Sequence, residues 1–157
     1  SEKTKIVLFF GLIRKYKGLE LIIKAFNETS LKNTNNIVLY IAGECYEDQK
    51  KYTDLVTHLG IDDRVIFDLT FKNSKEISLI FSASDIVAQT YHSATQSGVT
   101  PLAYFYQKPI LVSDIKGLRA PIEKDKTGEW TSKEPKEIAA NIKKMLEDNN
   151  YRRYQKN

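Results

Sequence analysis

Short apolar runs alternate along the chain with segments of helical periodicity, and this alternation constrains the fold more than any other feature. Nearly every position in the runs is apolar, as in strands that are covered on both faces of a sheet. Between the runs, apolar residues recur about every three to four positions, which is typical of amphipathic helices. Strands are predicted at 5–10, 37–42, 65–67, 85–88 and 110–112, and helices at 18–28, 52–59, 74–81 and 138–146, with one more short helix before 109. This order predicts an α/β fold built on a doubly wound parallel sheet.

Capping and turn residues place several helix ends. Asn73 and Glu76 stand three positions apart ahead of a helical pattern, so we expect a reciprocal cap there. Pro135 suits the first turn of the last helix, with Thr131 or Ser132 as its cap. Residues 117–126 are predicted to form a loop with one helical turn at most, and residues 128–130 a short edge strand.

Composition excludes several classes of protein. A length of 157 residues predicts a single domain, 1–157, with a core of its own. The net charge of +4 is spread along the chain, without the basic and aromatic clusters that bind nucleic acid, so no nucleic-acid partner is expected. Cys45 is the single cysteine, which rules out an internal disulfide and fits a reducing, cytoplasmic compartment. No apolar run approaches the roughly 20 residues of a membrane span.

A basic loop follows the first predicted strand. Residues 11–18 begin and end with Gly11 and Gly18 and include Arg14, Lys15 and Lys17. Arginine can grip phosphate oxygens with two hydrogen bonds, and lysine supplies a point charge. The glycine patterns of dinucleotide-binding folds and P-loops are absent, which argues against a dehydrogenase and an ATPase. A solvated basic loop without a ligand remains the alternative.

A loop of small polar residues follows the fourth predicted strand. Thr95, Gln96, Ser97, Gly98 and Val99 stand where that strand gives way to a short helix. Low side-chain bulk there would let an anion approach free backbone N–H groups at the positive end of the helix. Ligands of doubly wound sheets bind at the carboxyl ends of the strands, which is where both loops lie. A plain strand-to-helix turn remains the alternative.

Metal binding and nucleophilic catalysis find no support in the sequence. His58 is expected on the surface of the second helix, and His92, in the loop after the fourth strand, has no partner nearby in sequence. No cluster has the spacing of metal ligands, and no Ser-His-Asp order can be argued.

Several short motifs occur together and in order over nearly the whole chain. They are Gly11 with Lys17-Gly18, then Ala42-Gly43-Glu44, then Ile80-Phe81-Ser82-Ala83-Ser84-Asp85-Ile86, then Lys108-Pro109-Ile110, Gly117-Leu118 and Lys126-Thr127-Gly128. As a set they resemble the C-terminal donor-binding domain of the family-4, or group 1, GT-B glycosyltransferases. The resemblance implies a Rossmann-like sheet, the C-terminal half of a GT-B fold.

The same resemblance implies a function. The donor substrate would be a nucleoside-diphosphate sugar, with no cofactor and no metal, and its diphosphate would be held by Gly11, Lys17 and Arg14. The N-terminal acceptor-binding domain would be missing from this chain, so the isolated domain is expected to bind donor without transferring sugar. For the full enzyme, the resemblance suggests polysaccharide biosynthesis in the cytoplasm, with association at the inner face of the membrane.

This chain departs from the family pattern at four positions. The usual arginine after the first glycine would fall at Leu12, so Arg14 is expected to replace it. Three family glutamates would fall at Ala94, Leu102 and Ala120, which are apolar. Sugar and ribose recognition and the stereochemical outcome therefore stay open. A half-domain of a sugar-nucleotide epimerase and a non-catalytic domain that binds a nucleotide or a protein are the alternatives.

Overall fold

The computed structural model describes residues 3–148. Within them, parallel strands form a single sheet in the order β3-β2-β1-β4-β5-β6. The strands are β1 Lys5–Phe10, β2 Ile37–Ala42, β3 Val65–Asp68, β4 Ile86–Gln89, β5 Ile110–Ser113 and β6 Gly128–Thr131. The predicted α/β parallel sheet is confirmed, including the short edge strand near residue 128.

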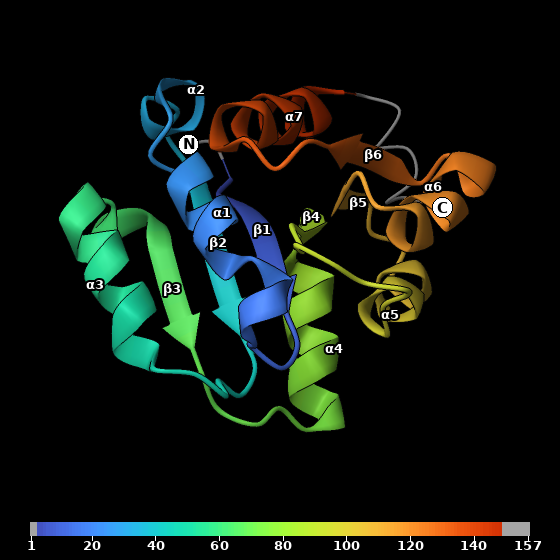
Figure 1. Ribbon diagram of the computed structural model, residues 1–157, viewed down its shortest axis with the longest axis horizontal. Helices are drawn as coiled ribbons and strands as arrows, with labels where there is room; N and C mark the ends of the chain where they lie inside the picture. Colours follow the sequence, from blue (N-terminus) through green and yellow to red (C-terminus); the bar gives the residue numbers. More distant parts are fainter. Residues whose placement is uncertain (1–2, 149–157) are drawn as a thin grey trace.

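Helices flank this sheet, whose central pair of strands is β1 and β4 (Figure 1). Helix α1 packs against both α3 and α7, and α4 reaches the sheet where the Phe81 ring meets Phe10 edge-on. The α-helices are α1 Leu19–Ala25, α2 Thr29–Lys32, α3 Gln49–Leu59, α4 Ser74–Ala83, α5 Val99–Phe105, α6 Lys116–Asp125 and α7 Pro135–Glu147, and 3-10 turns lie at η1 Lys15–Lys17 and η2 Asp62–Arg64.

The apolar runs form the core because both faces of the central strands are covered. Val7, Leu8 and Phe9 in β1 are at most 1% exposed, although they point alternately to opposite faces. The strand β1 pairs with β2 along its whole length, from Lys5 opposite Ile37 onward. A run with a single polar face could not occupy this position without burying polar side chains.

The predicted reciprocal cap is present at the start of α4. The Glu76 N–H donates to Asn73 Oδ1 at 2.9 Å, and the Asn73 N–H donates to Glu76 Oε1 at 3.3 Å. At α7, Pro135 lies in the first turn as predicted, but neither proposed residue is the cap. Glu134 is the N-cap, and its N–H donates to the Ser132 hydroxyl at 3.3 Å.

Two predicted helical segments differ from the structure. Residues 117–126, predicted to be mainly a loop, lie almost entirely in the ten-residue helix α6. Pro121 is tolerated inside it because Leu118 and Ile122, four positions apart, bury one face against the core. The single helix predicted over 18–28 ends at Ala25, and a separate turn of helix begins at Thr29.

The loops after β1 and β2 remain paired beyond the strands. The Ile13 N–H donates to the Glu44 carbonyl at 2.8 Å, and Ile13 forms an isolated parallel bridge with Cys45. Gly43 allows this close approach, because a Cβ there would lie 2.0 Å from the Gly11 carbonyl oxygen. The carboxyl edge of the sheet therefore extends into a rigid pair of loops.

Candidate functional site

The sheet changes its winding direction between β1 and β4. From β1 the chain continues to β2 and β3 on one side, and then crosses over to β4 on the other side. The loops after β1 and β4 therefore flank the point where the winding direction changes, and ligands of such sheets usually bind in a crevice between these loop ends. These are the two loops in which the sequence predicted a site.

Backbone contacts hold the two loops together across this crevice. The His92 N–H donates to the Tyr16 carbonyl at 2.7 Å, and Thr90 Oγ1 donates to the Gly18 carbonyl at 3.1 Å. Gly18 has a φ of 62°, and a Cβ there would lie 2.1 Å from the Thr90 carbonyl oxygen. A side chain at position 18 would therefore force the loops apart.

The Lys17 side chain is the most unusual group at the crevice. Its residue is only 9% exposed, and within residues 3–148 its ammonium has no hydrogen-bonding or ion-pairing partner. The ammonium lies 5.5 Å from the centre of the Tyr91 ring and 6.0 Å from that of Tyr16. Burial, and secondarily the charge of Arg14, lowers the pKa of Lys17 below its usual 10.5. A buried cation without a carboxylate partner is costly unless an anion comes to it.

Gly11 and Val99 bring the first loop and α5 to this ammonium. A Cβ built on Gly11 would lie 2.9 Å from Lys17 Nζ and 3.6 Å from Val99 Cγ2. Gly11 has a φ of 126°, which only glycine adopts readily. The structure thus places Gly11, Lys17 and Val99, three of the residues singled out in the sequence, around one point.

Arg14 stands further out on the same loop. It is exposed, and its guanidinium carbon lies 4.7 Å from the centre of the Tyr46 ring, in the loop after β2. A guanidinium stacked on an aromatic ring keeps its N–H edge free for hydrogen bonds. Arg14 therefore presents a second positive charge at the rim. Leu12, where the family motif predicts an arginine, is 43% exposed and supplies no charge.

The loop before α5 presents fewer free N–H groups than the sequence predicted. The Val99 N–H donates to the Ser97 hydroxyl at 3.1 Å, so it is already occupied. That hydroxyl also lies 3.5 Å from the Tyr91 hydroxyl. Gly98 has an ordinary φ of −69°, and the space beside its Cα is open. Thr95 and Gln96 are exposed on the same loop.

His92 has a partner that the sequence did not indicate. Its Nε2 pairs with Glu20 Oε1 at the start of α1, and Lys133 Nζ donates to the His92 carbonyl at 2.8 Å. Glu20 and His92 are 72 positions apart, so only the fold brings them together. These contacts fix the loop after β4 against α1. His58 is exposed, as predicted.

Comparison with known proteins now places the chain. Residues 1–157 match the family model described as Glycosyl transferases group 1. The chain belongs to this family. It is 30% identical over 156 residues to an uncharacterized glycosyltransferase of Methanocaldococcus jannaschii, covering 98% of this chain and 39% of that relative. The chain therefore spans about two fifths of the length of this curated relative.

Solved structures of glycosyltransferases share the fold. The C-terminal domain of a group 1 glycosyl transferase from Francisella tularensis superposes with a TM-score of 0.82 at 23% identity, covering 98% of this chain and 80% of that one. Anabaena HepE, solved in complex with UDP, superposes with a TM-score of 0.81 at 24% identity, covering 94% and 40%. These similarities confirm the Rossmann-like fold of GT-B glycosyltransferases that the sequence motifs predicted.

The three apolar positions where this group 1 chain departs from the family motif have separate environments. Ala94 and Leu102 pack against the hydrophobic core. Ala120 is exposed on α6, beside a surface hollow that Asp114 and Glu123 also line. The carboxylates in that hollow belong to ion pairs with Arg119.

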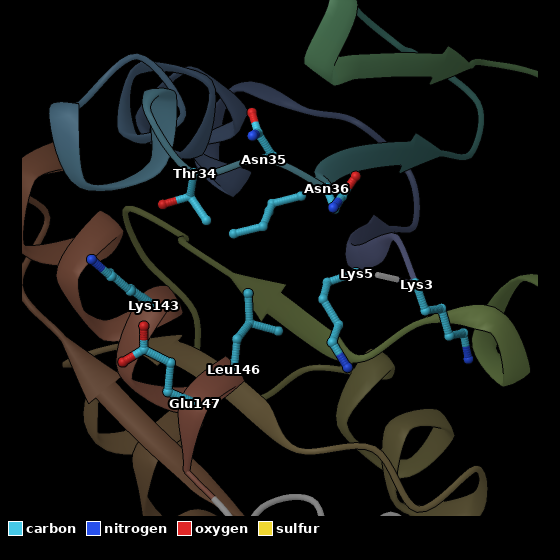
Figure 2. Close-up of a pocket in the computed structure, with 9 residues that line it drawn as sticks. Lys3, Lys5, Thr34, Asn35, Asn36, Lys143, Leu146 and Glu147 are labelled. Carbon is cyan, nitrogen blue, oxygen red and sulfur yellow. The ribbon is translucent and has the colours of Figure 1, made fainter. Parts of the chain in front are cut away.

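Metal binding, membrane insertion and a cavity at the amino edge of the sheet were considered as other possible functional features of the described residues. Within residues 3–148, no group of three or more His, Cys, Asp or Glu side chains could hold a metal ion, and no helix is long and apolar enough to cross a membrane. A cavity of about 470 Å³ lies at the opposite, amino edge of the sheet, where Lys5, Asn36 and Lys143 border it with Leu146 from α7 (Figure 2). None of these polar side chains is buried, so this cavity is an open surface hollow.

Proposed function

We propose that this chain binds the nucleoside-diphosphate sugar of a glycosyltransferase, with the diphosphate in the crevice between the loops after β1 and β4. The observation that carries the proposal is the buried Lys17 ammonium beside Gly11, which has no hydrogen-bonding or ion-pairing partner among residues 3–148. A diphosphate supplies the missing negative charge, and the absence of a side chain at Gly11 lets it approach the backbone closely.

The relatives support this choice of ligand. Anabaena HepE has been solved with UDP and with UDP-glucose, and its fold over the matched region is that of this chain. In this proposal Arg14 adds a second cation at the rim of the site, and Ser97 and Gly98 approach the ligand from the loop before α5. We propose that Thr95, Gln96 and Val99 also contact the nucleoside-diphosphate sugar from this loop.

The proposed chemistry is electrostatic. When the bond between the sugar and the diphosphate breaks, negative charge grows on the departing phosphate oxygens. Lys17 and Arg14 would stabilise that charge in place, without having to reorganise as the bond breaks. No metal or organic cofactor is required in this scheme, because these two side chains already supply two positive charges at the crevice.

The acceptor is proposed to bind elsewhere in a longer protein. The chain spans only 39% of the M. jannaschii relative, and we propose that it is the C-terminal domain, with an N-terminal domain supplying the acceptor site. Donor binding without sugar transfer is then expected from this chain alone, because the acceptor must be held close to the donor for reaction. A cytoplasmic enzyme of polysaccharide biosynthesis that docks on the inner membrane face is the setting we propose.

A non-catalytic nucleotide-binding domain is the second candidate. The observation in its favour is the apolar side chain at Ala94, Leu102 and Ala120, where glutamates are expected from the family motif. Release of free nucleoside diphosphate by the full-length protein in the presence of acceptor would favour the enzyme. Tight donor binding without such release would favour the binder.

A ligand screen tests the proposal directly. The melting temperature of the 157-residue chain would be measured with UDP, GDP, ADP and dTDP, and with the matching nucleosides. A ligand at 100 times its dissociation constant stabilises the folded state by about 2.7 kcal/mol, which is easily detected. Stabilisation by a diphosphate but not by its nucleoside is expected. No shift with any diphosphate would contradict the proposal.

A further inference from the structure

A second cavity lies beside the crevice, between α5 and α6. Its volume is about 450 Å³, and it is bordered by residues 95–97, by the first two turns of α5 and by Gly117 and Pro121 of α6. Ser97 joins the two sites, because it lines the cavity and its hydroxyl is 3.5 Å from the Tyr91 hydroxyl. The Tyr91 ring in turn faces the Lys17 ammonium.

The cavity lining combines polar and apolar groups and carries no charged side chain. Hydroxyl and amide groups come from Gln96, Ser97 and Thr100, and apolar surface comes from Pro101 and Tyr104. All of the described lining residues are uncharged at neutral pH. Hydroxyl partners beside flat apolar surfaces suit a sugar ring, which carries hydroxyl groups on its edge and C–H groups on its faces.

One lining hydroxyl is fixed from beneath by a buried amide. Thr100 is 8% exposed, and its Oγ1 accepts a hydrogen bond from Gln89 Nε2 at 3.2 Å. Gln89, at the end of β4, is fully buried, and its Oε1 has no partner among the described residues. Because the amide occupies a lone pair of the Thr100 oxygen, the hydroxyl proton is left to donate elsewhere, and no described residue accepts it. Buried polar groups of this kind are costly and rarely left without a partner.

We propose that this cavity receives an uncharged sugar unit of the substrate, and that Thr100, positioned by Gln89, is a specificity-determining residue. The inference rests on the proposed function, because a diphosphate held at Lys17 would bring its attached sugar to the neighbouring cavity. The sugar could come from the donor or from an acceptor glycan. Both present the same neutral, hydroxyl-rich chemistry.

Calorimetry on matched variants tests this role. UDP, UDP-glucose, UDP-glucuronic acid and free maltose would be titrated into the wild-type chain, Thr100→Val and Thr100→Ser, with GDP and GDP-mannose added if the chain prefers guanosine. Loss of one neutral hydrogen bond should weaken UDP-glucose binding to Thr100→Val about threefold to tenfold. UDP binding should not change, and Thr100→Ser, which keeps the hydroxyl, should behave as wild type. Thr53→Val, on the exposed surface of α3, is the control for the substitution itself.

The ligands separate the outcomes. UDP-glucuronic acid should bind the wild-type chain more weakly than UDP-glucose, because its carboxylate would enter an uncharged cavity. A loss confined to maltose would support the cavity as a sugar site and assign it to the acceptor. Equal affinities of wild type and Thr100→Val for UDP-glucose and for maltose would overturn the inference, as would an equal loss for UDP. Failure of the chain to bind any nucleoside diphosphate would instead contradict the proposed function on which the inference rests.

A measurement on the wild-type chain guards against a Thr100→Val protein that does not fold. Threonine methyl groups would be isotopically labelled, and the Thr100 signal identified as the one missing from Thr100→Ser. That signal should shift when UDP-glucose is added and stay in place with UDP alone. An unchanged Thr100 signal with UDP-glucose and with maltose would overturn the inference without any apolar substitution.

Discussion

Replacement of Lys17 by methionine should separate ligand binding from folding. Methionine has nearly the same length as lysine and keeps the contacts with Tyr16 and Tyr91, but it removes the ammonium. The ammonium is 9% exposed and has no partner in the described residues, so the folded protein loses no ion pair. We therefore expect Lys17→Met to melt at the wild-type temperature or above it.

The sign of this stability effect follows from the lowered pKa of Lys17. Burial disfavours the charged form in the folded state, so folding at neutral pH bears the cost of desolvating a charge. That cost falls as the pH rises through the lowered pKa towards the usual value for lysine, because the folded protein then loses its proton before the unfolded chain does. The wild-type stability should therefore rise with pH in this window relative to that of Lys17→Met.

Binding should change in the opposite direction. A charge-assisted hydrogen bond to phosphate contributes about 1.5–3 kcal/mol, so Lys17→Met should bind UDP roughly 10 to 150 times more weakly. Uridine, which lacks the phosphates, should be almost unaffected. Lys15→Met is the matched control, because Lys15 lies in the same 3-10 turn but is exposed. Lys17→Arg should restore part of the affinity and remove its decline at alkaline pH.

Isothermal titration calorimetry with UDP and uridine, together with thermal melts, measures all of these quantities. If Lys17→Met and Lys15→Met weaken UDP binding equally, the buried ammonium has no special role. If uridine and UDP lose the same affinity, Lys17 does not contact the phosphates. If Lys17→Met melts well below the wild type, the ammonium has a structural partner and the argument from its isolation fails.

Three further predictions concern the loops and the length of the chain. Gly98→Val should fold with a stability within about 0.5 kcal/mol of wild type, because the φ of −69° and the open space suit a side chain. Its binding of UDP, measured by calorimetry, should nevertheless be lost, and unchanged binding would remove Gly98 from the site. Gly18→Ala should lower the free energy of unfolding, measured in urea, by about 1–3 kcal/mol. The loss should exceed that of Gly60→Ala, because Gly60 has a similar φ of 69° but a Cβ there would meet nothing within 4 Å. Equal losses would show that backbone strain, and not the clash with Thr90, decides the effect. The 157-residue chain should release no nucleoside diphosphate from a donor in the presence of a glycan acceptor in a coupled assay, and efficient release would show that no further domain is needed.

The sequence predicted the parts of the fold that depend on local pattern. The apolar runs gave the strands, because burial on both faces leaves no room for polar positions, and the Asn73 and Glu76 spacing gave the cap of α4. The helix α6 was missed because Pro121 and Gly117 dominated a short pattern in which only Leu118 and Ile122 are buried. One apolar pair four positions apart is too weak a signal to outweigh two residues that usually interrupt helices.

The candidate site was harder to predict because its decisive properties come from contacts between distant segments. The basic loop could be found from Arg14 and Lys17, but both residues look alike in sequence. Only the fold shows that Arg14 is exposed and lies over the Tyr46 ring, whereas Lys17 is buried next to Tyr91, which lies in the loop after β4. The same is true of the loop before α5, where the Ser97 hydroxyl occupies the Val99 N–H and Gln89 fixes Thr100. Because the strand order places β4 beside β1, Gly11 and Lys17 of the first loop meet Tyr91 and Val99, which follow β4 in the chain. The residue types alone therefore predict the site less well than the polar atoms that the fold leaves without a partner among residues 3–148.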